Sequence, residues 1–160
     1  MSDLVIVIPF TADPDCDLDQ MAEQMQAFFN SIQNHRLGEN VGADIDNIDI
    51  VYQPTPYQCA ADDYVILFAH GAQDRTTLYN NQGQQISMAN ATAKLTAINA
   101  QQTTRVLFMC CYSGLAGHIG ANWKIANPGQ ETFGGDSAIS NLYSSTRTQI
   151  YAVCAALFPL

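Results

Sequence analysis

Residues 65–71 read Val-Ile-Leu-Phe-Ala-His-Gly, and residues 106–114 read Val-Leu-Phe-Met-Cys-Cys-Tyr-Ser-Gly. Each stretch is an apolar run of strand length that stops at a chemically reactive side chain and continues into turn-forming residues. Unbroken apolar runs of this kind are typical of strands buried on both faces of a parallel sheet. The two stretches therefore predict adjacent strands of an α/β fold, with His70 and Cys111 at one edge of the sheet.

The rest of the chain alternates apolar runs with amphipathic segments. Further strands are expected at residues 4–8 and 48–52, beside those at 64–69 and 105–110, with a short fifth strand at 123–126. Helices are expected at residues 17–32, 88–100 and 138–158, and a small hairpin at 77–87. Pro9 is expected to end the first strand, and Asp17 to cap the first helix. The pattern predicts one domain, residues 1–160, built as a three-layer α/β/α sandwich around a mainly parallel sheet of about five strands.

Charge limits the classes of partner. The 160 residues are 48% hydrophobic, and fifteen Asp and Glu residues outnumber six Lys and Arg residues to give a net charge of −9. Nucleic acids and anionic membranes require a basic surface, so neither is an expected partner. No apolar stretch reaches the roughly 18 residues that a membrane-spanning helix needs. A cationic partner or substrate is easier to accommodate.

The cysteine pattern and the amino terminus indicate a compartment. Five cysteines without paired spacing fit a reducing environment rather than a disulfide framework. The first residues lack the positive region and cleavage site of a signal peptide, so a cytoplasmic location is expected. No metal is expected, because the chain has no Cys-x-x-Cys pair, no His-x-x-x-His pair and no EF-hand spacing. No other cofactor is expected, since the loop at residues 9–15 is acidic and lacks the glycines of a phosphate-binding loop.

The two strand ends together suggest a cysteine nucleophile and its base. A thiol is only slightly ionised at neutral pH, and a nearby imidazole either takes its proton or holds the thiolate by charge. Gly71 has no Cβ and accepts positive φ, so the backbone can approach a substrate there. The amides of Gly71 and Cys111 are candidates for an oxyanion hole. Taken singly, a buried core cysteine and a hydrogen-bonded structural histidine are the simpler explanations.

The order and spacing of these motifs resemble those of the caspase-like cysteine peptidases, which include caspases, metacaspases, legumains, gingipains and CHAT-domain proteases. In these families one hydrophobic strand ends in His-Gly and a second ends in Cys, often as Cys-x-Ser-Gly. The hairpin at 77–87 resembles the one that commonly follows the His-Gly, and residues 125–136 resemble the strand and loop after the nucleophile in legumain-like and CHAT-like members. The resemblance covers roughly residues 4–140, and it implies His70 as the catalytic histidine and Cys111 as the nucleophile.

The resemblance also implies where a substrate binds. The loop after the first strand borders the pocket for the residue before the scissile bond, and a later loop contributes to it. The candidate substrate-binding residues are Asp13, Asp15, Met109, Asn127 and Asp136. A solvated acidic turn with a helix cap at Asp17 is the simpler explanation of the first loop. Metacaspases have an Asp at the place of Met109, so their pocket for a basic residue is not implied here, and the caspase Gln-Ala-Cys motif is absent as well. Because the chain is acidic and the loop also holds Asp17, we expect a basic or neutral residue before the scissile bond.

Three classes of function follow. The first is a cysteine endopeptidase that cleaves a protein or peptide substrate through a thioester intermediate. The second is a caspase-fold domain without activity, which serves as an interaction or regulatory module for a regulatory partner or a second copy of the chain. The third is an unrelated α/β protein, such as a flavodoxin-like binding domain, which the missing glycine-rich loop disfavours. Selective reaction of Cys111 with an electrophile distinguishes the first from the second.

Overall fold

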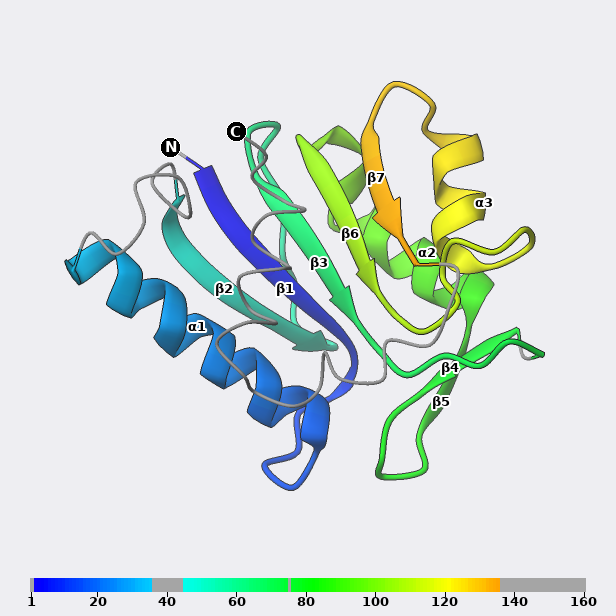
Figure 1. Cartoon of the computed structure of the whole chain (residues 1–160), viewed down its shortest axis with the longest axis horizontal. Coiled ribbons are helices and arrows are strands. Elements are labelled where there is room, and N and C mark those ends of the chain that lie inside the picture. Colours follow the sequence, from blue (N-terminus) through cyan, green and yellow to red (C-terminus); the bar gives the residue numbers. More distant parts are fainter. Residues whose placement is uncertain (1, 36–44, 75, 136–160) are drawn as a thin grey trace.

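One parallel sheet organises the chain (Figure 1). The computed structural model describes residues 2–35, 45–74 and 76–135. The sheet of these residues has the spatial order β2-β1-β3-β6-β7, and all four neighbouring pairs are parallel. Its strands are β1 (Ser2–Thr11), β2 (Ile45–Gln53), β3 (Tyr64–Phe68), β6 (Arg105–Met109) and β7 (Glu131–Gly134). A separate antiparallel hairpin of β4 (Thr77–Tyr79) and β5 (Gln85–Ser87) follows β3.

Helices cover both faces of the sheet. Helix α1 (Asp17–His35) runs along β1 and β2 on one face, whereas α2 (Met88–Ala97) and α3 (Ile119–Ala126) lie together on the other (Figure 1). A short 3-10 turn, η1 (Ala100–Gln102), leads from α2 to β6. The arrangement confirms the predicted α/β class, the three-layer α/β/α sandwich and the mainly parallel five-stranded sheet.

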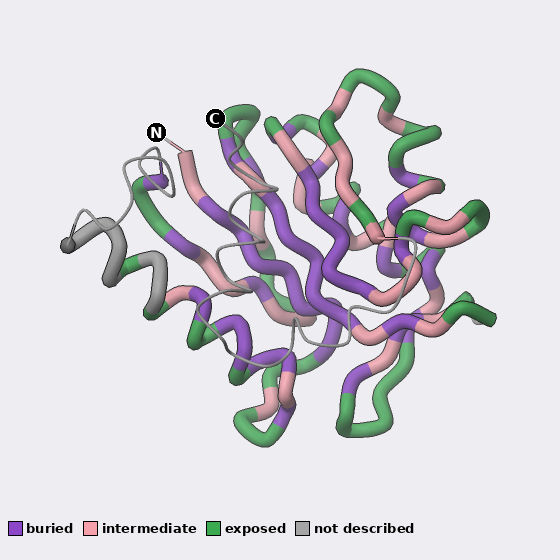
Figure 2. Tube along the Cα trace, in the orientation of Figure 1, coloured by how far each residue is buried: buried purple, intermediate pink, exposed green. Residues whose placement is uncertain are grey.

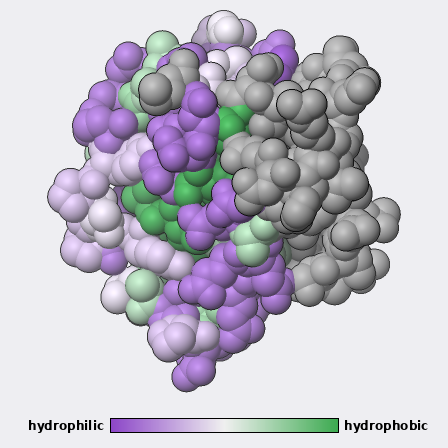
Figure 3. Space-filling model, turned by 90° about the vertical axis from the view of Figure 1, so that its left-hand side faces the viewer, coloured by the Kyte–Doolittle hydropathy of each residue, from purple (hydrophilic) through white to green (hydrophobic). Residues whose placement is uncertain are grey.

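Strand β1 shows why helices must pack on both faces of the sheet. Leu4, Val5 and Ile6 are each fully buried. Since consecutive residues of a strand point to opposite faces, both faces of β1 are shielded from water. Figure 2 shows the same distribution for the described residues, with buried central strands and exposed loop tips. From the side of β2 and α1, hydrophilic side chains lie beside a smaller hydrophobic area (Figure 3).

Helix α1 begins at Asp17, so Asp17 is the first helical residue rather than the cap residue before it. Its apolar residues recur at intervals of three and four, which places them on one side of the helix. The stripe is buried against the sheet through Leu18, Met21, Ala22 and Met25.

The prediction that Pro9 ends the first strand is wrong. Strand β1 continues to Thr11, and its register with β2 shifts between Val7 and Thr11. Proline cannot donate a hydrogen bond to the ladder, but an irregular stretch of a strand does not require one at every residue. The irregularity therefore accommodates Pro9 inside the strand.

The predicted strand at 123–126 is also wrong, because these residues form the second half of α3. Trp123 is 1% exposed and packs against Phe108, whereas Ile125 is 79% exposed. Residues two apart share a face in a strand but not in a helix, so this difference is helical. The fifth strand is β7 instead. Helix α2 ends at Ala97 rather than residue 100, and the helix predicted at 138–158 lies outside the described residues.

Candidate active site

The ends of β3 and β6 place His70 and Cys111 at equivalent positions. The two strands pair in parallel register, and the last pair joins Phe68 to Met109. The amide of Ala69 continues the ladder by donating to the Met109 carbonyl at 3.5 Å. His70 and Cys111 each follow that last pair by two residues, so they leave the sheet side by side at its carboxyl edge.

Gly71 packs directly against the backbone of Cys111. A Cβ atom at position 71 would lie 2.5 Å from the Cys111 carbonyl oxygen, closer than any normal contact. Its φ is not in the left-handed region, so the expected need for positive φ is not what selects glycine here. The close approach of the two backbones selects it.

The turn after Cys111 is fixed by tight packing against the end of β7. Tyr112 has a φ of 62°, which is uncommon for a residue with a side chain. The next residue, Ser113, is 1% exposed, and its hydroxyl donates to the Phe108 carbonyl at 3.1 Å. A Cβ atom at Gly114 would lie 2.7 Å from the Gly134 carbonyl, so the Ser-Gly sequence lets the turn contact β7.

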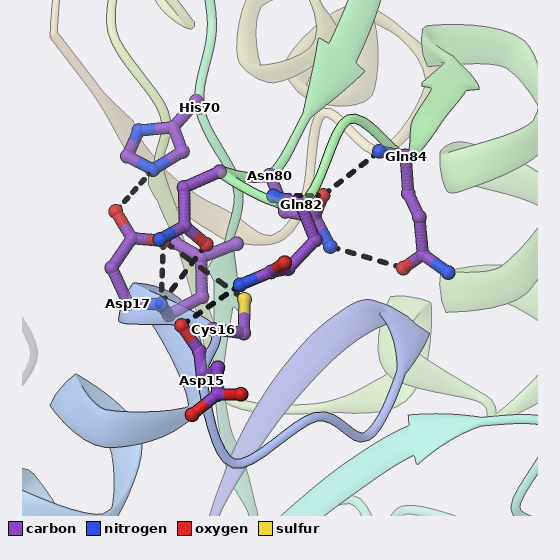
Figure 4. A network of polar contacts seen from close by, with 9 residues as sticks. Asp15, Cys16, Asp17, His70, Asn80, Gln82 and Gln84 are labelled. Atoms are coloured by element: carbon purple, nitrogen blue, oxygen red, sulfur yellow. Dashed lines mark hydrogen bonds and ion pairs between the residues drawn. The ribbon is translucent and has the colours of Figure 1, made fainter.

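Two contacts orient the His70 ring. Its backbone exchanges two hydrogen bonds with Tyr79 of the hairpin, at 2.8 and 3.0 Å, and the two rings stack with centroids 5.6 Å apart. The Nε2 atom of His70 lies 2.7 Å from Oδ2 of Asp17 (Figure 4). A carboxylate only accepts hydrogen bonds, so the hydrogen of a neutral ring lies on Nε2 and the lone pair on Nδ1.

Asp17 is itself held from two sides. Its Oδ1 accepts from the Leu18 amide at 2.9 Å, in the first turn of α1. Its own amide donates to Oδ1 of Asn81, in the hairpin tip, at 3.1 Å. Sequence reasoning treated Asp17 as a helix cap or pocket acid and missed its contact with His70. A signal for it existed, since the loop after β1 ends at the same edge of the sheet as His70.

The hairpin tip is a closed polar network (Figure 4). Asn80 is 3% exposed, and its side-chain oxygen accepts from the amides of Gln82 and Gln84 at 3.1 and 2.9 Å. The Gln82 side chain donates to the Asp15 carbonyl at 2.9 Å. The tip is therefore tied to the loop that leads into α1.

Two of the predicted substrate-binding residues lie in that loop. Oδ1 of Asp13 accepts from the Asp15 amide at 2.9 Å, and the Asp13 amide donates to Asp19 at 2.7 Å. The Asp15 side chain is exposed. The Asp13 carboxylate thus closes a local turn. Asp15 is tied to the hairpin tip through the hydrogen bond between its carbonyl and Gln82.

Of the other predicted substrate-binding residues, Met109 is buried and Asn127 lies elsewhere. Met109 is 1% exposed and lies in the core. Asn127 ends α3, where its side-chain amide donates to the Trp123 carbonyl at 3.1 Å. In the turn that follows, the Gln130 side-chain amide donates to the carbonyl of Thr103, which lies just before β6. Asn127 therefore lies toward the amino edge of the sheet. The expectation that Asn127 lies at the site followed from reading residues 123–126 as a strand. Asp136 lies outside the described residues.

Cys111 is the most accessible of the four cysteines in the described residues, all of which carry thiols. Cys110 is fully buried, and burial raises the pKa of its thiol. Burial also raises the pKa of Cys59, to about 12. These two thiols are therefore poor nucleophiles at neutral pH.

The third histidine of the chain besides His35 and His70, His118, lies at the start of α3. Its Nε2 lies 3.1 Å from the Gln73 carbonyl. Within residues 2–35, 45–74 and 76–135, no group of three or more His, Cys, Asp or Glu side chains is arranged to hold a metal ion. None of the helices in the same ranges has the length and apolar character that a membrane crossing requires.

The chain matches no protein-family model, no curated protein and no solved structure. Its chemistry is therefore inferred from its own residues. These are a thiol and an imidazole at paired strand ends, and a carboxylate that holds the imidazole.

Proposed function

We propose that this protein is a caspase-like cysteine endopeptidase that hydrolyses peptide bonds of a protein or peptide substrate. The observation that carries the proposal is the in-register placement of His70 and Cys111, with Gly71 packed against the Cys111 backbone. The hairpin that follows His70 supports it, since the resemblance implies one there. Cys111 is the nucleophile, and His70 is the general acid and base.

The reaction has two halves. Nδ1 of His70 takes the Cys111 proton, and the thiolate attacks the peptide carbonyl to form a tetrahedral intermediate. The amides of Gly71 and Cys111 stabilise its oxyanion. The imidazolium then protonates the leaving amine, and a thioester remains. In the second half, His70 deprotonates a water that attacks the thioester, and the thiol and a carboxylic acid product are released.

Asp17 is a positioning residue in this scheme. Its carboxylate accepts from Nε2 at 2.7 Å, which favours the tautomer whose Nδ1 can receive a proton. It also stabilises the imidazolium that forms during the reaction.

The substrate preference follows from charge. The loop after β1 carries Asp13, Asp15 and Asp17, and burying a substrate carboxylate beside unpaired acids is costly. Arg105 pairs with Glu131 at the amino ends of β6 and β7, away from this loop. A basic or neutral residue is therefore preferred before the scissile bond. A cytoplasmic location belongs to the same proposal, because the described cysteines carry thiols.

A cleavage profile of a peptide library tests the proposal, with wild type compared with Cys111→Ala. Wild type should cleave a subset of peptides, and the variant should cleave none. A folded wild-type protein that cleaves no peptide, and whose Cys111 reacts with iodoacetamide no faster than its other cysteines, would instead indicate a regulatory or interaction module, alone or as a homo-oligomer. Equal cleavage by both proteins would exclude Cys111 as the nucleophile.

A further inference from the structure

A groove runs along the carboxyl ends of β1 and β2 and is bordered by the hairpin and α2. It consists of three adjoining hollows of about 620, 430 and 540 Å³. Residues 53–58, 9–11, 84–86 and one side of α2 line them. Lys94 is common to all three, so we call this surface the Lys94 groove.

Lys94 is the only charged residue that lines the Lys94 groove in the described part of the chain. The protein has fifteen acidic residues, and no Asp or Glu within residues 2–35, 45–74 and 76–135 is in this lining. Among the described residues, Asp49 approaches the lining through a hydrogen bond from the Tyr57 hydroxyl, at 2.7 Å, but does not line the groove. Lys94 forms no ion pair with an acid in residues 2–35, 45–74 or 76–135. Within those ranges its ammonium is therefore available to an external anion.

The partial burial of Lys94 favours binding of an anion. The side chain is half-buried, and loss of water lowers its pKa. A group that has lost solvation without gaining a partner interacts more strongly with an incoming carboxylate than an exposed lysine does. Because the rest of the protein is acidic, this attraction is local and is confined to the groove.

The walls suit an extended peptide. Pro9, Pro54 and Pro56 present rigid apolar surface, and the Tyr57 ring adds an aromatic one. The side-chain amides of Gln53 and Gln85 lie along the same lining and can bond to the backbone of a ligand. Three hollows in succession offer places for successive side chains rather than one deep pocket.

A lysine in the last turn of α2 also stabilises the helix through its macrodipole. That effect explains a basic residue at position 94. It does not explain why, among the residues that the structure describes, three adjoining hollows in a strongly acidic protein are lined by no acid.

We infer that the Lys94 groove binds an extended acidic peptide segment of a partner protein, with a carboxylate of the segment paired to the Lys94 ammonium. The binding is independent of the proposed cleavage, since neither His70 nor Cys111 lines the groove. The hairpin connects the two places. Gln85 of β5 lines the groove, and Asn81 of the same hairpin contacts Asp17.

The test uses full-length Cys111→Ala protein and fluorescein-labelled, end-capped hexapeptide pools. One pool has glutamate at its two central positions, and the matched pool has glutamine. Fluorescence anisotropy should show that the glutamate pool binds about 5–10-fold more tightly. Lys94→Gln should remove that preference. Lys124→Gln, which makes the same charge change at an exposed position of α3, should leave it intact.

A second variant keeps the inference falsifiable. Gln85→Glu places an acid in the groove, so it should weaken the glutamate pool severalfold and spare the glutamine pool. Equal binding of both pools to the unsubstituted groove, no binding of either, or equal effects of Lys94→Gln and Lys124→Gln would overturn the inference. A preference for inorganic phosphate over both pools, measured by competition, would also overturn it. Cleavage by wild type bears only on the proposed function, so the two can fail separately.

Discussion

Nε2 of His70 lies 2.7 Å from Oδ2 of Asp17, although 53 residues separate the two in the sequence. Asp17 comes from the first turn of α1, and His70 comes from the end of β3. The contact exists because the loop after β1 folds back over the carboxyl edge of the sheet. Several measurable consequences depend on it.

Substituting Asp17→Asn should reduce kcat of peptide cleavage at least about tenfold with little change in KM, because an amide neither carries the charge nor enforces the tautomer. Alkylation of Cys111 by iodoacetamide near neutral pH should slow as well. Asp15→Asn is the matched control, since Asp15 is exposed and contacts the hairpin through its backbone carbonyl. Equal losses in the two variants would show that loop charge, and not the contact, matters.

Removing the hydrogen bond between the hairpin and Asp17 should also reduce kcat, but less than Asp17→Asn does. In Asn81→Ala the Asp17 amide loses its acceptor, so cleavage should fall severalfold while the free energy of unfolding falls by about 1 kcal/mol or less. Gln82→Ala removes the neighbouring contact to the Asp15 carbonyl and should leave kcat within about twofold. If the Gln82 variant loses more activity than the Asn81 variant, general anchoring of the tip is the stronger influence.

Gly71→Ala should destabilise the protein by about 1–3 kcal/mol and reduce cleavage, since the new methyl group would displace the Cys111 backbone. Gly129→Ala is the control, because nothing lies within 4 Å of a Cβ atom there. Its effect should stay within about 0.5 kcal/mol. Chemical denaturation measures both, and equal values would contradict the close packing at position 71.

Substitutions of Cys110 and Cys111 should have clearly different effects on stability and cleavage. Cys110→Ala should cost about 1 kcal/mol of stability and keep most of the activity, because Cys110 is fully buried. Cys111→Ala should abolish cleavage and stay folded. Peptide mapping after brief alkylation at pH 8 should find the label on Cys111, since burial raises the pKa of the Cys110 thiol. Label on Cys110 would contradict this assignment.

The sheet was predictable because burial on both faces leaves a plain mark on a sequence. Leu4 to Ile8 and residues 65–69 are unbroken apolar runs, and they became central strands. The pattern did not resolve residues 123–126, because a short apolar run suits a strand and a helix equally. Trp123 is buried in either case, and the exposure of Ile125 decides between the two only once the structure is known.

The positions of His70 and Cys111 at one edge were predictable from the same runs. The identity of the carboxylate beside His70 was not. The sequence does not indicate which of Asp13, Asp15 and Asp17 faces His70, because that depends on the path of the loop and the start of α1. The contact of Asn81 with Asp17 was even harder to predict, since it depends on how the hairpin packs across that loop.

The packing around Ser113 constrains how this protein can diverge. A Cβ atom at Gly114, Gly120 or Gly134 would lie 2.7 Å from an atom of a neighbouring segment. A side chain at any of these positions forces the main chain after Cys111 to take another path. Homologues that keep this turn should therefore keep all three glycines, even after the hydrophobic strands have exchanged most of their residues. Covariation at these sites should mark lineages in which the turn was rebuilt.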